Sequence, residues 1–195
     1  SAVGSPIGKI AIDAPMEPHL EDMKRYAEAA HILGTERIRM FSFFLPPHSH
    51  RQYRGEVLRR MNLLLDTADS EGVACYHENE KDIYGDRAEY VLDLHRQLGH
   101  RLHGVFDPAN YIQCGERPMK IYGELAPYID YLHLKDALLA DGAVVPAGKG
   151  EGQLAELLDA FAAKEGPRFL TIEPHLSVFE GLSSLQPEEL THHYQ

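Results

Sequence analysis

The sequence predicts an α/β fold with a mainly parallel sheet, and a (β/α)₈ barrel is the form that it favours. Short apolar or β-branched runs alternate with longer segments of helical spacing, as in repeated strand–helix units. Neither a G-x-G-x-x-G turn nor a Walker-type phosphate loop is present, although an open doubly wound sheet commonly carries one. Several apolar runs instead end in a carboxylate or imidazole side chain, and barrel enzymes build their sites at such strand ends.

The expected strands are short runs of aliphatic, aromatic and β-branched residues. In chain order they are Lys9–Ile12 (with Ala2–Gly4 as a separate short strand), Ile38–Phe44, Val73–Glu78, Gly104–Asp107, Tyr131–Lys135 and Phe169–Glu173. No fixed-period repeat and no Gly/Ser-rich linker interrupts this series, so we expect one domain.

The expected helices show apolar residues at three- and four-residue spacing. They are Leu20–Leu33, Tyr53–Ser70, Arg87–Leu98, Lys120–Ala126 and Leu154–Lys164, with a further helix beginning near Pro187. In the first, Leu20, Met23 and Ala27 share one face, and Gly34 ends the helix because glycine tolerates a positive φ.

Composition excludes several classes of function. The 195 residues include 19 Lys and Arg against 30 Asp and Glu, a net charge of −11, which disfavours non-specific nucleic-acid binding. No apolar stretch approaches the roughly 20 residues of a membrane span, and no signal peptide is recognisable. Two cysteines cannot form a disulfide framework, so we expect a cytoplasmic protein without nucleic-acid or membrane partners.

Four of the expected strands carry a metal-ligand type at the carboxyl end. These residues are Glu78, Asp107, His133 and Glu173, spaced by 29, 26 and 40 residues, which fits one strand–helix unit per step. Carboxylates that end apolar strands are expensive to bury unless they are paired or bound to metal. Converging on one barrel mouth, the four would bind one divalent ion, and mixed carboxylate and imidazole ligands suit Mn²⁺, Mg²⁺, Co²⁺ or Zn²⁺.

Each of these residues also has an ordinary structural interpretation. Asp-Pro is a common turn start, a lone histidine on an apolar strand is often a core residue, and a strand-end glutamate is often solvated. Lys135 shares a strand face with His133, so it would hold a substrate oxygen or form a salt bridge with Asp136. Arg39 would meet a substrate anion or a buried carboxylate.

Short motifs in order along the chain resemble a known family. They are IRMFSFF, YHENE followed by IYGD, FDPAN, YLHLKDA, PAGKGEG and TIEPHL, between residues 37 and 176. Together they resemble the xylose-isomerase-like TIM-barrel superfamily, in its sugar (phosphate) isomerase/epimerase branch. The resemblance implies one divalent metal at the barrel mouth, held by Glu78, Asp107, His133 and Glu173.

The resemblance also implies roles in catalysis. Glu78 and Glu173 would be the acid/base pair that removes a proton beside a carbonyl and returns one. Lys135, Arg39 and His175 are candidates to contact the substrate. Glu80 joins them as a substrate contact or as a carboxylate that orients a ligand. The partner would be a small sugar or sugar phosphate, and a homo-oligomer remains open.

By the same resemblance, the domain spanning residues 1–195 would hold strands three to eight of the barrel. The first two strand–helix units have no counterpart in the sequence, so the barrel is expected to be incomplete at both ends. A full barrel typically takes about 250 residues.

Three alternatives to an isomerase or epimerase stay open. An inosose-type dehydratase would use the same proton abstraction. An abasic-site endonuclease is disfavoured, because DPAN has asparagine where that branch has a histidine ligand, and because of the acidic charge. A barrel without catalysis would be expected to lack at least one of the four ligands. No arginine lies between His133 and Arg168, which weakens a free-ketose specificity.

Overall fold

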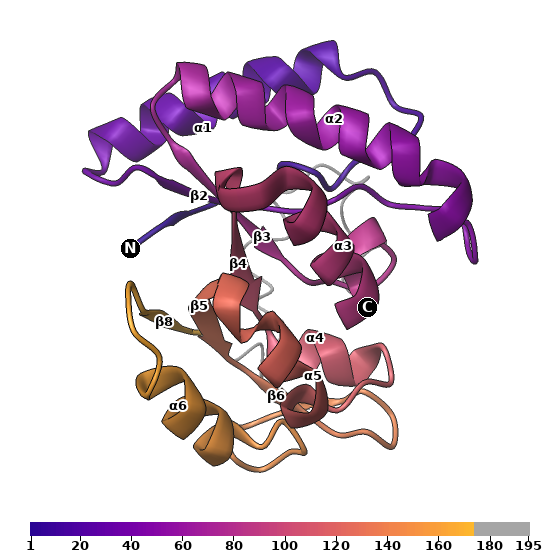
Figure 1. Ribbon diagram of the computed structural model, residues 1–195, viewed down its shortest axis with the longest axis vertical. Coiled ribbons are helices and arrows are strands. Elements are labelled where there is room, and N and C mark those ends of the chain that lie inside the picture. The colour runs from indigo at the N-terminus through magenta and orange to yellow at the C-terminus, as the bar shows by residue number, and fades with distance from the viewer. Residues whose placement is uncertain (174–195) are drawn as a thin grey trace, which may run out of the picture.

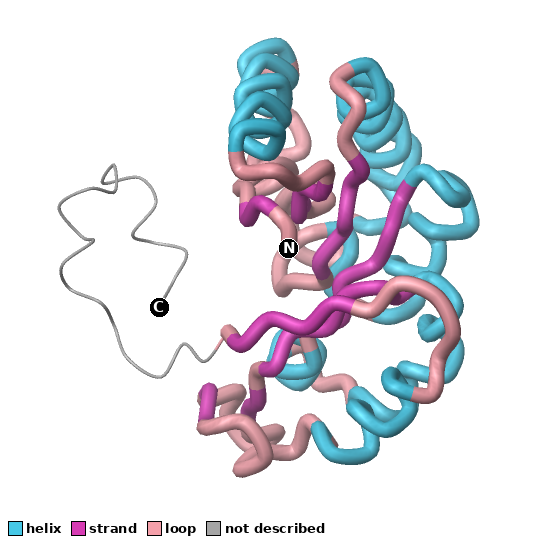
Figure 2. Tube along the Cα trace, turned by 90° about the vertical axis from the view of Figure 1, so that its left-hand side faces the viewer, coloured by secondary structure: helices cyan, strands magenta, loops and turns pink. Residues whose placement is uncertain are grey.

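A computed structural model describes residues 1–173 and shows six parallel strands that curl into an arc with helices outside (Figures 1 and 2). The sheet order is β1-β2-β3-β4-β5-β8, so neighbours in the sheet follow chain order. Its strands are β1 (Val3–Gly4), β2 (Arg37–Met40), β3 (Ala74–Glu78), β4 (Leu102–Phe106), β5 (Ile129–Leu134) and β8 (Phe169–Ile172). A separate antiparallel hairpin pairs β6 (Asp136–Ala137) with β7 (Val144–Val145).

Helices connect successive strands, which is the strand–helix alternation that the sequence predicts. They are α1 (Glu17–Ile32), α2 (His50–Ser70), α3 (Ala88–Leu98), α4 (Pro108–Gln113), α5 (Pro118–Leu125) and α6 (Leu154–Ala162), with short 3₁₀ turns at Tyr84–Asp86, Gly99–Arg101 and Ala126–Tyr128. All five helices predicted within the described residues are confirmed. The helix expected near Pro187 lies outside them.

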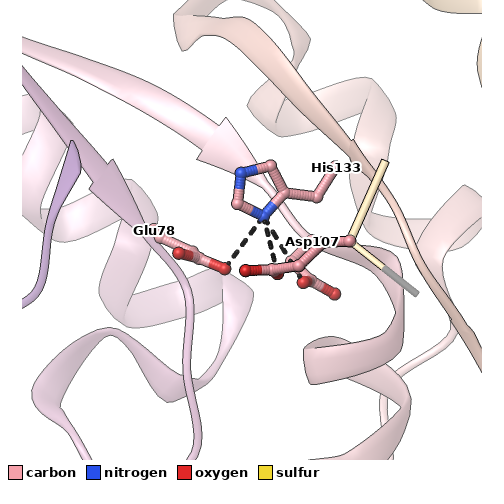
Figure 3. A group of neighbouring side chains, drawn as sticks. Glu78, Asp107 and His133 are labelled. Carbon is pink, nitrogen blue, oxygen red and sulfur yellow. Dashed lines mark ion pairs between the residues drawn. The ribbon is translucent and has the colours of Figure 1, made fainter. Parts of the chain in front are cut away.

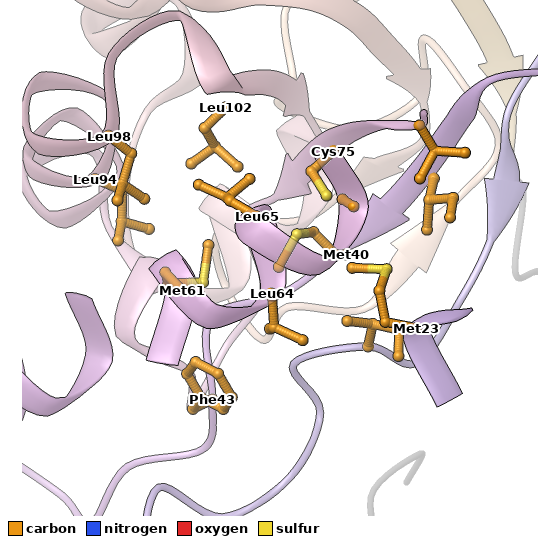
Figure 4. Packing of buried hydrophobic residues seen from close by; sticks show 14 of the residues in the cluster. Met23, Met40, Phe43, Met61, Leu64, Leu65, Cys75, Leu94, Leu98 and Leu102 are labelled. Atoms are coloured by element: carbon orange, nitrogen blue, oxygen red, sulfur yellow. The ribbon is translucent and has the colours of Figure 1, made fainter. Parts of the chain in front are cut away.

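The outer face of the sheet packs against the helices. On β2, Ile38 and Met40 are fully buried under α1 and α2, whereas Arg37 and Arg39 alternate with them and point inside the arc. Met23, Met61 and Leu64 reach these strands from the helices, and the packing extends to α3 (Figure 4). A second apolar cluster joins β4 and β5 to α5 and α6.

One predicted strand is wrong. Residues 9–12 form turns with a single bridge from Ala11 to Phe44, not a strand. The segment follows the short β1 and lies along the chain after β2, where Phe41 and Phe43 donate to the carbonyls of Ile7 and Gly8. It is therefore a loop at the carboxyl end of the sheet, held by backbone hydrogen bonds.

Within residues 1–173, none of the helices combines the length and apolar character that a membrane span requires. The curled parallel sheet with outer helices matches the predicted barrel class. Because all strands of the arc run parallel, their carboxyl ends meet at one mouth.

Candidate metal centre

Four predicted ligands come together at this mouth. Glu78 ends β3, Asp107 follows β4, His133 lies in β5 and Glu173 follows β8. One ligand atom from each residue lies within 4.8 Å of the corresponding atoms of the others. Figure 3 shows Glu78, Asp107 and His133 from three different elements pointing toward one another. The side chains converge because the four strands are adjacent, parallel and in a register that turns these positions inward.

The imidazole of His133 is at the centre of the group. Its Nδ1 lies 3.1 Å from Glu78 Oε1, 3.2 Å from Glu173 Oε2 and 3.6 Å from Asp107 Oδ2. Glu78, Asp107 and His133 are buried, and the side chain of Glu173 is 24% exposed. Three carboxylates at such separations repel one another strongly unless a cation lies among them.

Two buried atoms of the group have no hydrogen bond of acceptable geometry to any described residue. They are His133 Nδ1 and Asp107 Oδ2, and both face the centre of the cluster. Buried polar atoms in native proteins are almost always satisfied, so a buried nitrogen and a buried carboxylate oxygen without hydrogen bonds are suited to binding a cation. Three carboxylates and one imidazole are ligands that a small divalent ion accepts. The residues present therefore fit such an ion.

The pKa shifts of His133 and Glu78 show that the cluster favours positive charge. Burial disfavours the imidazolium of His133, but the carboxylates of Asp107, Glu173 and Glu78 outweigh burial and raise its pKa to about 12. Burial also raises the pKa of Glu78, yet His133 and Arg39 together hold it well below its usual range. The metal-free cluster thus holds a proton on His133 where an ion would compete for the nitrogen.

The backbone around Asp107 fixes this ligand. Its Oδ1 accepts from Asn110 N at 2.9 Å, which caps α4, and Oδ2 is left for the cluster. Asn79 bridges β3 and β4, since its Oδ1 accepts from Asp107 N at 2.9 Å and its Nδ2 donates to Asp107 O at 3.0 Å. Asp107 is therefore the turn residue of one sequence interpretation, and its role as a metal ligand remains a prediction.

The sequence singled out Asn110 only as a departure from a histidine ligand. In the structure its side chain donates to Asn79 O at 2.9 Å and accepts from Lys135 Nζ at 2.9 Å. It is a buried connector between β3, α4 and Lys135. A polar residue one helical turn after a strand-end aspartate was the available sequence signal.

Lys135 lies against the cluster. Its Nζ is 3.4 Å from Asp107 Oδ2 and 3.9 Å from Glu173 Oε2. The alternative salt bridge with Asp136 is wrong, because Asp136 accepts from four backbone N–H groups, those of Ala137, Gly148, Gly150 and Gly152. The glycine-rich GKGEG segment thus folds around a carboxylate of this chain, and a Cβ at Gly150 would lie 2.4 Å from Asp136 Oδ1.

Arg39 also reaches the cluster. Its Nη1 lies 2.7 Å from Glu78 Oε2, so the two oxygens of Glu78 are divided between Arg39 and His133. The expected buried ion pair is therefore present, and contact with a substrate remains a prediction.

Other candidates lie farther from the ligands. Glu80 Oε2 pairs with Lys9 Nζ at 3.1 Å, so its partner among the described residues is a cation and not a ligand side chain. His175 lies outside the described residues.

His77 is buried with Nε2 2.9 Å from Ser42 Oγ, and burial lowers its pKa to about 3, so it is a neutral core residue. Burial raises the pKa of Cys75 and of Cys114 to about 12, which makes both thiols inert.

Solved structures share this fold at low sequence identity. The probable 3-DHS dehydratase AsbF of Bacillus anthracis superposes with a TM-score of 0.74 and 18% identity, over 89% of this chain and 69% of that one. A D-tagatose 3-epimerase-like protein superposes with a TM-score of 0.70 and 17% identity, over 89% of this chain and 70% of that one. A xylose isomerase-like TIM barrel protein from Mycobacterium smegmatis, solved in complex with magnesium, has a TM-score of 0.68 and 17% identity. The match covers 91% of this chain and 67% of that one.

A search of curated proteins finds no significant match. A family model described as "Xylose isomerase-like TIM barrel" matches residues 5–190, which is nearly the whole sequence. That match agrees with the parallel arc and with four ligand-type side chains at its mouth. The chain therefore belongs to the xylose isomerase-like TIM barrel family.

Proposed function

We propose that this protein is a divalent-metal-dependent isomerase or epimerase of sugars or sugar phosphates. The observation that carries the proposal is the buried Glu78–Asp107–His133–Glu173 cluster with its orphaned nitrogen and oxygen. We assign all four residues as ligands of one divalent ion, with Mn²⁺, Mg²⁺, Co²⁺ and Zn²⁺ as candidates. A bound ion would polarise a substrate carbonyl and stabilise the negative charge of an enediolate.

The residues of the chain supply the proton transfers. Glu78 ends β3 and Glu173 follows β8, and both contact His133, so they would flank a substrate seated over the cluster. One carboxylate takes the proton from the carbon beside the carbonyl and the other returns one. Arg39, Lys135, Glu80 and His175 are assigned to substrate binding or orientation.

A dehydratase of a cyclic polyol is the second candidate. It begins with the same proton abstraction and then expels a hydroxyl group in place of returning the proton. The fold likeness to a probable dehydratase supports keeping it beside the epimerase reading. An abasic-site endonuclease is disfavoured, because Asn110 makes hydrogen bonds to Asn79 and Lys135. We expect a cytoplasmic enzyme of carbohydrate metabolism acting on a small molecule.

The decisive test joins metal content to proton exchange. Purified protein should contain about one divalent ion per chain after incubation with Mn²⁺, and Glu173→Gln should weaken its retention. Wild-type protein in D₂O should introduce deuterium beside the carbonyl of its substrate, followed by NMR over a panel of ketoses, ketose phosphates and inososes. Formation of an unsaturated product would select the dehydratase. Absence of both metal and exchange would refute the proposal.

A further inference from the structure

The ammonium group of Lys135 is buried with few acceptors of its own. The side chain is only 6% exposed, and among residues 1–173 Nζ donates one hydrogen bond, to Asn110 Oδ1 at 2.9 Å. The other close carboxylate oxygens in the described part of the chain are Asp107 Oδ2 at 3.4 Å and Glu173 Oε2 at 3.9 Å. An ammonium group carries three donors, so two of them depend on carboxylates that belong to the cluster.

A cation in the cluster would draw on those same carboxylates. Asp107 Oδ2 is the oxygen turned toward His133 Nδ1, and Glu173 Oε2 lies 3.2 Å from the same nitrogen. With their charge shared by an ion, Lys135 keeps one hydrogen bond to a neutral amide. A buried ammonium group in that condition is costly unless another anion meets it.

Two further cationic side chains lie near the cluster and near one another. Arg39 pairs with Glu78 at 2.7 Å, and Lys9 pairs with Glu80 at 3.1 Å. Both stand over one aromatic ring, since Arg39 Cζ is 4.7 Å and Lys9 Nζ is 4.2 Å from the centroid of Phe41. The ring of Phe41 therefore makes cation–π contacts with both Lys9 and Arg39 near the cluster.

The charges around the mouth point to the sign of the ligand. Among the described residues, four carboxylates (Glu78, Glu80, Asp107 and Glu173) face three cationic side chains (Lys9, Arg39 and Lys135). This leaves one net negative charge while His133 is neutral. One divalent ion reverses it to one net positive charge, so the loaded mouth is complementary to an anion.

We propose that the substrate is anionic, with a carboxylate or phosphate group on the carbonyl compound, and that Lys135 receives this group with Arg39 and Lys9 beside it. The inference rests on the proposed function, because it places the substrate at the metal cluster. It narrows that function to acidic or phosphorylated substrates.

The test compares three probes that share a hydroxyketone and differ in charge. They are hydroxyacetone, which is neutral, hydroxypyruvate, which carries a carboxylate, and dihydroxyacetone phosphate. Binding to Mn²⁺-loaded protein is measured by calorimetry, and Mn²⁺ affinity is measured separately by EPR. We expect at least one charged probe to bind ten- to a hundredfold more tightly than hydroxyacetone. That ratio is the gain in affinity that one charge-assisted hydrogen bond typically provides. The preferred probe identifies carboxylate or phosphate.

Variants assign the preference to Lys135. Lys135→Met should reduce the preference at least tenfold, while Mn²⁺ affinity is retained or rises because a neighbouring positive charge is lost. Lys135→Gln keeps a hydrogen-bond donor to Asn110 and should lose the charge preference to the same extent. This variant carries the test if Lys135→Met does not fold. Lys24→Met is the matched control, since Lys24 is exposed and its salt-bridge partner among the described residues is Glu21 on α1.

The outcomes separate the two proposals. Failure to bind Mn²⁺ would refute the proposed function and this inference with it. Mn²⁺ binding with equal affinity for the three probes would refute the inference alone and leave a neutral polyol as substrate. A charge preference that survives both Lys135 variants would also overturn it, because the ion would then account for the preference.

Discussion

Replacing Asp136 with asparagine should destabilise the protein through a single lost oxygen. Oδ1 accepts from Ala137 N at 2.9 Å and Gly152 N at 2.8 Å, and Oδ2 accepts from Gly148 N at 3.0 Å and Gly150 N at 2.9 Å. An asparagine presents one oxygen and one NH₂ group, so in either orientation two backbone donors meet a donor.

The magnitude follows from these two bonds. Hydrogen bonds to a charged acceptor contribute about 1.5–3 kcal/mol each, so their loss amounts to roughly 3–6 kcal/mol. Gly148 is exposed and regains water, which lowers the expected fall in the free energy of unfolding to about 2–4 kcal/mol. With a urea m-value near 2 kcal/mol/M, the midpoint should move by about 1–2 M.

The assay is urea unfolding followed by far-UV circular dichroism, because the chain has no tryptophan. Asp141→Asn is the matched control, since Asp141 is exposed and accepts one bond, from Ala143 N at 2.9 Å, which asparagine also accepts. The control should change stability by less than about 0.5 kcal/mol. A loss below about 1 kcal/mol for Asp136→Asn would refute the argument that this carboxylate organises the loop.

Three further predictions concern protons and packing. Because the pKa of His133 is raised to about 12 in the metal-free protein, Mn²⁺ binding near pH 7 should release about one proton, measurable by calorimetry in buffers of different ionisation enthalpy; zero release would contradict it. Burial lowers the pKa of His77 to about 3 and of His95 to about 4, so the unfolded chain binds more protons below pH 6.5. Stability should therefore fall between pH 6.5 and 4, and a flat unfolding profile in that window would exclude buried neutral histidines. Gly85→Ala should destabilise by about 2–4 kcal/mol in thermal unfolding, because its Cβ would lie 2.4 Å from His77 Cε1, whereas Gly55→Ala in open space should not.

The barrel class and the ligand cluster were predictable from sequence because both depend on regular patterns. Short apolar, aromatic and β-branched runs mark the strands, and a parallel sheet brings all their carboxyl ends to one edge. Glu78, Asp107, His133 and Glu173 could thus be assigned to one place from strand ends alone, and the structure brings their side chains together.

Contacts that depend on loops were not predictable in the same way. Residues 9–12 have a strand-like composition, yet backbone hydrogen bonds with the chain after β2 hold them as turns. The partner of Lys135 could not be chosen from its neighbour Asp136, because the four amides that occupy Asp136 come largely from a loop twelve to sixteen residues away. Helix α4 was missed because six residues are too few to show helical periodicity.

The two oxygens of Asp107 and of Glu78 have different partners in the structure. Asp107 has committed Oδ1 to the first turn of α4, and Glu78 has committed Oε2 to Arg39. The other oxygen of each residue, Asp107 Oδ2 and Glu78 Oε1, lies toward His133 Nδ1. Calcium prefers six to eight oxygen ligands and often bidentate carboxylates, whereas Mn²⁺, Mg²⁺, Co²⁺ and Zn²⁺ accept fewer protein donors. In the proposed metal site, the ligand set would therefore suit an ion that accepts one oxygen from each of these two carboxylates.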